Sequence, residues 1–144
     1  ERLVSEIAKK HPGEFAASVT FDNDLAHMIY AGADIFLMPS LFEPCGLSQM
    51  ISMRYGTVPV VRETGGLKDT VIPYNEYTGE GTGFAFKNPS SGELACITGY
   101  AASVYRDRKD AWEWLIRKGM QQDFSWKKSA AGYKAVYKSI TGKV

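Results

Sequence analysis

The sequence of 144 residues contains few of the residues from which metal centres and disulfide scaffolds are built. It has two histidines, His11 and His27, and two cysteines, Cys45 and Cys96, and these four residues show no clustered ligand spacing. The sequence therefore predicts no metal site. Two cysteines without the dense pattern of a secreted scaffold indicate a reducing, cytosolic environment.

Long apolar runs and an excess of charge are also absent. No apolar run approaches the roughly 18 residues that span a membrane, and no signal peptide is visible. Lys and Arg number 17 and Asp and Glu number 16, for a net charge of +1. This balance offers no electrostatic reason to expect a nucleic-acid partner. Because the chain begins at Glu1 rather than Met, we interpret it as a piece of a longer protein.

The pattern of the chain predicts one α/β domain over residues 1–144. The apolar fraction of 44% is typical of a folded globular protein. Helices are expected at 1–10, at about 23–32 with Asp22 or Asn23 as N-cap, at 46–55, and at about 90–106, 108–121 and 126–140. Strands or shorter extended pieces are expected at 16–20, 34–38, 57–61, 69–73 and 83–86. This order predicts a Rossmann-like parallel sheet with helices on both faces, although Pro59 is unusual inside a central strand.

The last predicted helix has an unusual apolar face. Ser125 is its expected N-cap. Side chains spaced by four, three, four and three residues share one side of the helix: Trp126, Ala130, Tyr133, Tyr137 and Ile140. The spacing leaves two interpretations open, in which the face covers the core of this domain or docks on another domain.

A candidate anion site follows the apolar strand at residues 34–38. The loop after Pro39 carries Glu43 past the carboxyl edge of the sheet, where open α/β sheets bind their ligands. The next helix begins near Gly46, and the free N–H groups of Gly46, Leu47 and Ser48 are expected to face the same crevice and to hold a diphosphate. A carboxylate at Glu43 suits hydrogen bonding to sugar hydroxyls. The pattern alone also fits a glutamate that only caps the helix.

Several segments resemble one enzyme family. The chain is similar to bacterial glycogen synthases and plant starch synthases over nearly its whole length, and the Glu-Pro-Cys-Gly-Leu segment is more specific than a generic nucleotide motif. The matching segments are Asp34 to Met50 (DIFLMPSLFEPCGLSQM), Met53 to Arg62 (MRYGTVPVVR), Thr64 to Val71 (TGGLKDTV), and Asp123 to Trp126 (DFSW) with Ala130, Tyr133 and Tyr137.

The resemblance implies a fold and a reaction. Members of this family have two Rossmann-like domains that face a deep cleft, the GT-B arrangement, and this chain corresponds to an N-terminally truncated C-terminal domain. They transfer glucose from ADP-glucose to the non-reducing end of an α-1,4-glucan with retention of configuration, without a metal or another cofactor. We therefore expect ADP-glucose, an α-1,4-glucan and the missing N-terminal domain as partners, with no nucleic acid and no membrane. The expected location is the cytoplasm, or the plastid if the source is a plant.

The resemblance also implies roles for site residues. Glu43 matches the functional glutamate that holds the donor glucose and favours charge developing near the anomeric carbon. The segment Gly46, Leu47 and Ser48 matches the phosphate cradle. Cys45 matches a cysteine beside the donor sugar, with small apolar packing as the alternative, and Phe21 matches an aromatic residue next to the adenine, with core packing as the alternative.

Two more segments carry open alternatives. The segment Thr64, Gly65 and Gly66 follows the next strand, so it lines the sugar or acceptor side or forms only a tight turn. Arg62 either supports a phosphate or is a solvated side chain.

Three departures from the family pattern limit the activity expected of this chain. Many relatives carry a second glutamate eight positions after the first, where this chain has Ile51. The Arg and Lys that bind the diphosphate in the family precede Glu1, and the N-terminal domain is missing, so residues 1–144 are expected to be inactive alone.

In the family the end of the chain packs on the N-terminal domain, which favours the docking interpretation for residues 125–140 and predicts self-association through an exposed apolar face. The alternatives are a non-catalytic nucleotide- or glucan-binding module and a related UDP-glucose-dependent transferase.

Overall fold

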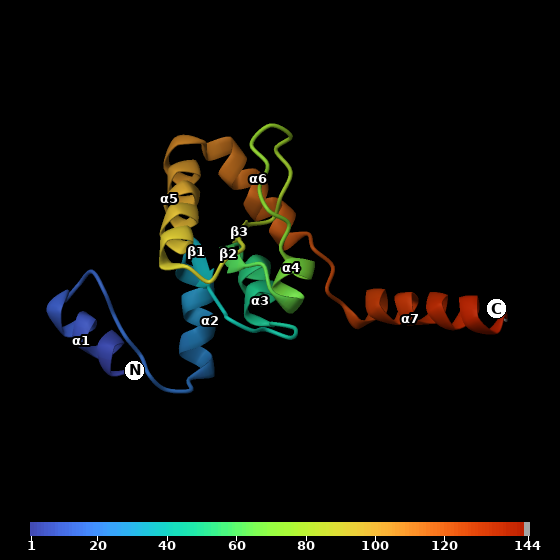
Figure 1. The fold of residues 1–144 in the computed structure, drawn as a ribbon, viewed down its shortest axis with the longest axis horizontal. Coiled ribbons are helices and arrows are strands. Elements are labelled where there is room, and N and C mark those ends of the chain that lie inside the picture. Colours follow the sequence, from blue (N-terminus) through green and yellow to red (C-terminus); the bar gives the residue numbers. More distant parts are fainter. Residues whose placement is uncertain (143–144) are drawn as a thin grey trace.

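The computed structural model describes residues 1–142 and contains a three-layer α/β domain with a helix projecting from either side (Figure 1). Three strands alternate with seven helices within the described residues. The elements are α1 (Arg2–Lys10), α2 (Asn23–Gly32), β1 (Ile35–Met38), α3 (Ser48–Tyr55), β2 (Val58–Arg62), α4 (Gly65–Thr70), β3 (Phe84–Phe86), α5 (Ser91–Asp107), α6 (Lys109–Met120) and α7 (Trp126–Thr141).

The three strands form one parallel sheet in the order β1-β2-β3, so their carboxyl ends meet at one edge. Pro59 lies inside the central strand β2 opposite Phe36, and its missing N–H is tolerated for a local reason. The Val58 N–H donates to the Asp34 carbonyl oxygen on the β1 side. The Pro59 nitrogen therefore faces the β3 side, where regular pairing begins one residue later at Val60.

Alternate side chains of β2 supply two apolar cores, one on each face of the sheet. Val58 and Val60 pack with Phe84 against helices α5 and α6, which contribute buried side chains such as Trp112 and Leu115. On the opposite face, Val61 packs with Met53 of α3 and Leu67 of α4, and Val71 belongs to the same cluster. A central strand that is buried on both faces reads as a continuous apolar run. The predicted parallel sheet with helices on both faces is therefore confirmed.

Side-chain caps explain where three of the helices begin. The side chains of Asp22, Ser90 and Ser125 accept hydrogen bonds from the backbone N–H groups of Leu25, Glu93 and Lys128, respectively. Both caps expected from the sequence, at Asp22 and Ser125, are thus present. Helix α3 has no side-chain cap at its start, which leaves its first N–H groups open.

The strand predicted at residues 16–20 is wrong. These residues form no strand, and Val19 is half exposed. A strand needs a hydrogen-bonding neighbour, and β1, β2 and β3 are the only strands of the sheet within the described residues.

The extended piece predicted at residues 69–73 is wrong in its first two residues, since Asp69 and Thr70 belong to α4. Val71 is extended, the Ile72 carbonyl oxygen accepts from the N–H groups of Thr82 and Gly83, and Pro73 forms an isolated parallel bridge to Gly83. The sequence hides this helix because it begins with two glycines, which are poor helix formers. Burial of Leu67 in the core provides the packing that a short helix needs.

The terminal helices α1 and α7 contribute no buried residues to the domain, and Figure 1 shows them extending away from it. Trp126 is 86% exposed, and Tyr133, Tyr137 and Ile140 are exposed on the same helix. The interpretation that the α7 face covers the core of this domain is therefore wrong. None of the helices described in residues 1–142 has the length and apolar character needed to cross a membrane.

Candidate functional site

The predicted catalytic residue lies on the loop that connects β1 to α3. Glu43 is partly buried, and within residues 1–142 its carboxylate has no hydrogen-bond or ion-pair partner. The guanidinium of Arg62, at the end of β2, holds this loop by donating to the carbonyl oxygens of Ser40, at 2.7 Å, and Leu41. Arg62 also donates to the Lys87 carbonyl oxygen at 3.4 Å. The alternative of a merely solvated Arg62 is wrong, because its side chain ties the loop to the sheet, and support of a phosphate by Arg62 stays a prediction.

The predicted anion cradle lies at the start of α3. Gly46 has a φ of 76°, which favours glycine, and the following Leu47 is in the right-handed helical region with φ −103° and ψ −33°. Backbone conformations of opposite hand in succession turn consecutive N–H groups toward one point and form an anion-binding concavity. Within the described residues, the N–H groups of Gly46, Leu47 and Ser48 donate no hydrogen bond to the protein. This geometry is suited to a phosphate group.

The structure brings the segment Thr64, Gly65 and Gly66 directly against this loop. The Gly66 N–H donates to the Glu43 carbonyl oxygen at 3.2 Å. A Cβ atom at Gly65 would lie 1.9 Å from the Glu43 carbonyl oxygen, and one at Gly66 would lie 2.0 Å from the Cys45 carbonyl oxygen. The two glycines therefore permit contact between two backbones, and the tight turn considered from the sequence is the first turn of α4. A role for these residues beside the sugar stays a prediction.

A residue that the sequence analysis did not single out joins the two loops. Gln49 of α3 is fully buried, and its side-chain Nε2 donates to the carbonyl oxygens of Gly46, at 2.8 Å, and Cys45, at 3.3 Å. Nε2 also donates to the Thr70 hydroxyl at 3.0 Å, and that hydroxyl donates to the Gly66 carbonyl oxygen at 2.6 Å. The available signal was a glutamine on the core-facing side of the predicted helix, where an apolar residue is the usual choice.

Phe21 and Cys45, the other predicted neighbours of the donor, are both exposed. Phe21 is 96% exposed and precedes α2, so the alternative of core packing is wrong for it. Two residues connect α2 to β1, so the start of the helix lies on the same side of the sheet as the carboxyl end of β1, the lower side in Figure 1. The Cys45 thiol is a free cysteine with a long contact of 3.8 Å to the Gly46 carbonyl oxygen, so apolar burial does not describe it either.

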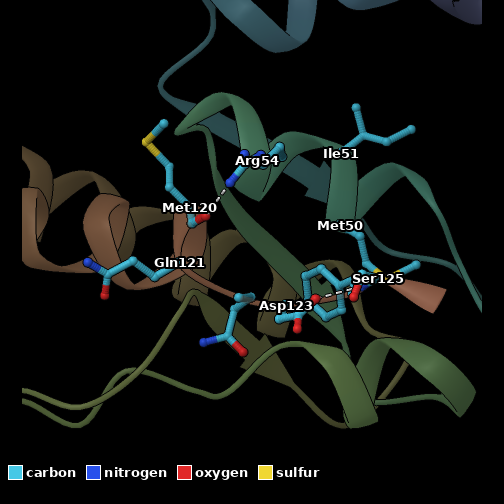
Figure 2. A pocket seen from close by; sticks show the side chains of 9 residues that line it. Met50, Ile51, Arg54, Met120, Gln121, Asp123 and Ser125 are labelled. Carbon is cyan, nitrogen blue, oxygen red and sulfur yellow. Dashed lines mark hydrogen bonds between the residues drawn. The ribbon is translucent and has the colours of Figure 1, made fainter. Parts of the chain in front are cut away.

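Two pockets adjoin α3. One, of about 620 Å³, is lined by Cys45 and Leu47 on one side and by Trp126 at the start of α7 on the other. The second, of about 600 Å³, is lined by Ile51, the position of the second glutamate in many relatives. Figure 2 shows its walls, with Arg54 of α3 donating to the Met120 carbonyl oxygen at 2.9 Å. Glu43 lines neither of these two pockets.

Three or more metal-ligating side chains do not come together anywhere in residues 1–142. The expected absence of a metal and of other cofactors stays a prediction.

A family model described as glycosyl transferases group 1 matches residues 2–108. The chain belongs to this family. Three-quarters of the sequence falls inside the match, which contains both loops of the candidate site and the helix that carries Gln49.

The most similar curated proteins include two bacterial glycogen synthases. The chain is 54% identical to the glycogen synthase of Lachnospira eligens over 91% of its own length and 27% of the relative. It is 55% identical to the glycogen synthase of Clostridium beijerinckii over 92% of its own length and 28% of the relative. The predicted resemblance to glycogen synthases is confirmed, and the chain spans less than a third of the relatives that it matches.

Two solved structures show the same fold. The catalytic domain of starch synthase IV from Arabidopsis thaliana, bound to ADP and acarbose, superposes with a TM-score of 0.85 at 35% identity, covering 99% of this chain and 30% of that one. Sucrose-phosphate synthase from Thermosynechococcus elongatus superposes with a TM-score of 0.67 at 22% identity over 98% of this chain and 34% of that one, which shows the fold alone. The expected fold, that of the C-terminal domain of a GT-B glycosyltransferase, is thereby confirmed.

Proposed function

We propose that residues 1–144 form the donor-binding half of a retaining glucosyltransferase that uses ADP-glucose and extends an α-1,4-glucan. The observation that carries the proposal is the adjacency of two complementary groups at the carboxyl edge of the sheet. Among the residues that the structure describes, the Glu43 carboxylate is unpaired and the N–H groups of the segment Gly46 to Ser48 have no protein acceptors. One loop therefore has groups for the hydroxyls of a sugar and for the diphosphate attached to it.

The same adjacency suggests how the reaction is assisted. In the transfer, the bond between the anomeric carbon and the diphosphate oxygen breaks. The 4-hydroxyl at the non-reducing end of the glucan supplies the new oxygen and passes its proton to the departing diphosphate. Positive charge develops at the sugar and negative charge on the departing diphosphate. A carboxylate near the first and N–H groups near the second stabilise both charges. In this proposal Cys45, Gly65 and Gly66 lie beside the donor sugar and Phe21 beside the adenine.

The proposal extends to partners and location. The chain spans less than a third of its relatives. We propose that the facing wall of the cleft is formed by another domain outside residues 1–144, so residues 1–144 alone are expected to bind the donor without turnover. The exposed apolar face of α7, formed by Trp126, Tyr133 and Tyr137, is proposed to dock on the other domain or, without it, on a second copy. No metal or further cofactor is included, and the proposed location is the cytoplasm.

A titration of the ¹⁵N-labelled chain with ADP tests the donor site. ADP is expected to shift the amide signals of Gly46, Leu47, Ser48 and Phe21, with a smaller effect for UDP as the matched control nucleotide. Transfer of glucose from ADP-glucose to glycogen by the intact protein is measured in parallel. If the intact protein uses ADP-glucose but ADP shifts no amide signal of residues 1–144, the main contacts with the donor lie outside these residues. If ADP causes no shifts and the intact protein transfers no glucose, the proposal is contradicted. If the intact protein prefers UDP-glucose, the related UDP-glucose-dependent transferase is supported instead.

A further inference from the structure

The side-chain amide of Gln49 is oriented by its neighbours. Nε2 lies within hydrogen-bond distance of the carbonyl oxygens of Gly46 and Cys45, and a reversed amide would place Oε1 against those two oxygens. Gln49 Oε1 is buried and has no partner within residues 1–142. A buried acceptor without a partner is unfavourable. The hydrogen bonds donated by Nε2 therefore explain why a glutamine lies in the core at this position, whereas the unpartnered Oε1 does not.

The two accepted carbonyl groups belong to the peptide units of the predicted anion cradle. In a planar trans peptide unit, the C=O of one residue and the N–H of the next point in opposite directions. No cis peptide bond occurs in the described residues. Because the Cys45 and Gly46 carbonyl oxygens are turned inward to Gln49, the N–H groups of Gly46 and Leu47 are turned outward. These are two of the three N–H groups of the cradle that have no protein acceptor within residues 1–142.

We propose that Gln49 is a positioning residue that aims the N–H groups of Gly46 and Leu47 at the diphosphate of the donor. Gln49 does not contact the substrate itself, since its side chain is fully buried. Its side chain holds the two peptide units in the orientation that anion binding requires before the ligand arrives. Such preorganisation matters because a cradle that must rotate on binding loses part of the binding energy. This role deepens the proposed function and rests on it for the identity of the anion.

The same amide links the cradle to the loop after the neighbouring strand. Gln49 Nε2 donates to the Thr70 hydroxyl, which donates to the Gly66 carbonyl oxygen, while the Gly66 N–H donates to the Glu43 carbonyl oxygen. These bonds form a continuous chain from the backbone of Glu43 through Gly66, Thr70 and Gln49 to Gly46. The spacing between the catalytic carboxylate and the N–H groups is therefore set by one connected network.

The orientation of the N–H groups can be measured in the labelled chain without a ligand. Residual dipolar couplings report the directions of the Gly46 and Leu47 N–H bonds. Through-hydrogen-bond couplings report whether the Gln49 side-chain nitrogen is bonded to the Cys45 and Gly46 carbonyl groups. The proposal expects both couplings in the unmodified chain and N–H vectors directed away from the Gln49 side chain. Absence of the through-bond couplings overturns it, whether or not any variant folds.

A variant pair separates positioning from packing. Gln49→Met keeps the size of the side chain but removes both donors, so the dipolar couplings of Gly46 and Leu47 are expected to change. Ser52→Ala is the matched control, because Ser52 is equally buried one turn further along α3, and within residues 1–142 its hydroxyl donates only to the Gln49 carbonyl oxygen, at 2.9 Å. The couplings are expected to be unchanged in this control. Unchanged couplings in Gln49→Met also overturn the proposal.

An ADP titration of the same proteins connects orientation to binding. Where the unmodified chain binds ADP, the dissociation constant is expected to rise at least about tenfold in Gln49→Met and to change little in Ser52→Ala. Rotated N–H vectors without weaker ADP binding overturn the functional part of the proposal. If the unmodified chain shows no ADP shifts, the intact protein supplies the readout: Gln49→Met is expected to raise KM for the donor while Ser52→Ala is not. If Gln49→Met rotates the N–H vectors but the intact protein does not use ADP-glucose, the positioning role of Gln49 stands and only the proposed function is contradicted.

Discussion

Substitution of Gly66 by alanine tests whether contact between two backbones holds the candidate site. Gly66 lies in the first turn of α4, where alanine is the better helix former by about 1 kcal/mol. Local propensity alone therefore predicts a more stable protein. The tertiary structure predicts the opposite, because a Cβ atom here would lie 2.0 Å from the Cys45 carbonyl oxygen and 2.6 Å from both the Cys45 Cα and carbonyl carbon.

The size of the effect follows from these distances. An ordinary contact between carbon and a carbonyl oxygen is about 3.3 Å, so the two backbones must separate by about 1.3 Å, starting from the 2.0 Å available. Neither backbone can move aside by changing a rotamer. Overpacking of this kind costs about 1–3 kcal/mol, and the hydrogen bond from the Gly66 N–H to Glu43 contributes about 1 kcal/mol more. After the gain in helix propensity, we expect Gly66→Ala to lower the free energy of unfolding by about 1–3 kcal/mol.

Urea unfolding followed by circular dichroism measures this change, with Gly99→Ala as the matched control. Gly99 lies inside α5, and no atom comes within 4 Å of a Cβ placed there, so alanine is expected to raise the free energy of unfolding by up to about 1 kcal/mol. In Gly66→Ala the amide signals of residues 43–48 are also expected to move. Equal stabilisation by both substitutions, with those signals unchanged, would refute the contact between the two loops.

Three other predictions follow from the site and its surroundings. Glu43→Gln is expected to lower kcat of the intact protein at least about 100-fold while urea unfolding of the chain is unchanged, since the carboxylate has no partner among residues 1–142. Hydrogen bonds from the side chain and backbone of Asn88 lower the pKa of Glu93 from its usual 4.5. The stability that ionised Glu93 contributes is therefore present above about pH 4.5 and is lost as the pH falls through the folded-state pKa. Glu93→Gln is expected to make the melting temperature fall less steeply as the pH is lowered. Sedimentation is expected to show association that depends on concentration and weakens in the double variant Trp126→Ser/Tyr137→Ser. The melting temperature of this variant is expected to be unchanged, because both side chains are exposed. A monomer at every concentration contradicts this prediction.

Periodicity and end signals in the sequence determined most of the secondary structure. The apolar run of β1, the valines of β2 and the caps at Asp22 and Ser125 depend on neighbours close in the chain, so short-range rules were sufficient for them. The segment from Glu43 to Ser48 was recognisable for the same reason, since a glycine after a strand and before a helix is a local pattern. The family resemblance then added a chemical meaning that the pattern did not have.

Contacts between distant segments decided the rest. Residues 16–20 have the composition of a strand but lack a pairing neighbour within the described chain, and the first turn of α4 is helical despite its two glycines because Leu67 and Thr70 are held by the core and by Gln49. The exposure of the α7 face likewise depended on where the helix lies, which its spacing does not contain. The pairing of Gln49 with the Cys45 and Gly46 carbonyl groups is also invisible in the sequence, because the direction of a peptide N–H is set by the three-dimensional position of its hydrogen-bond partners.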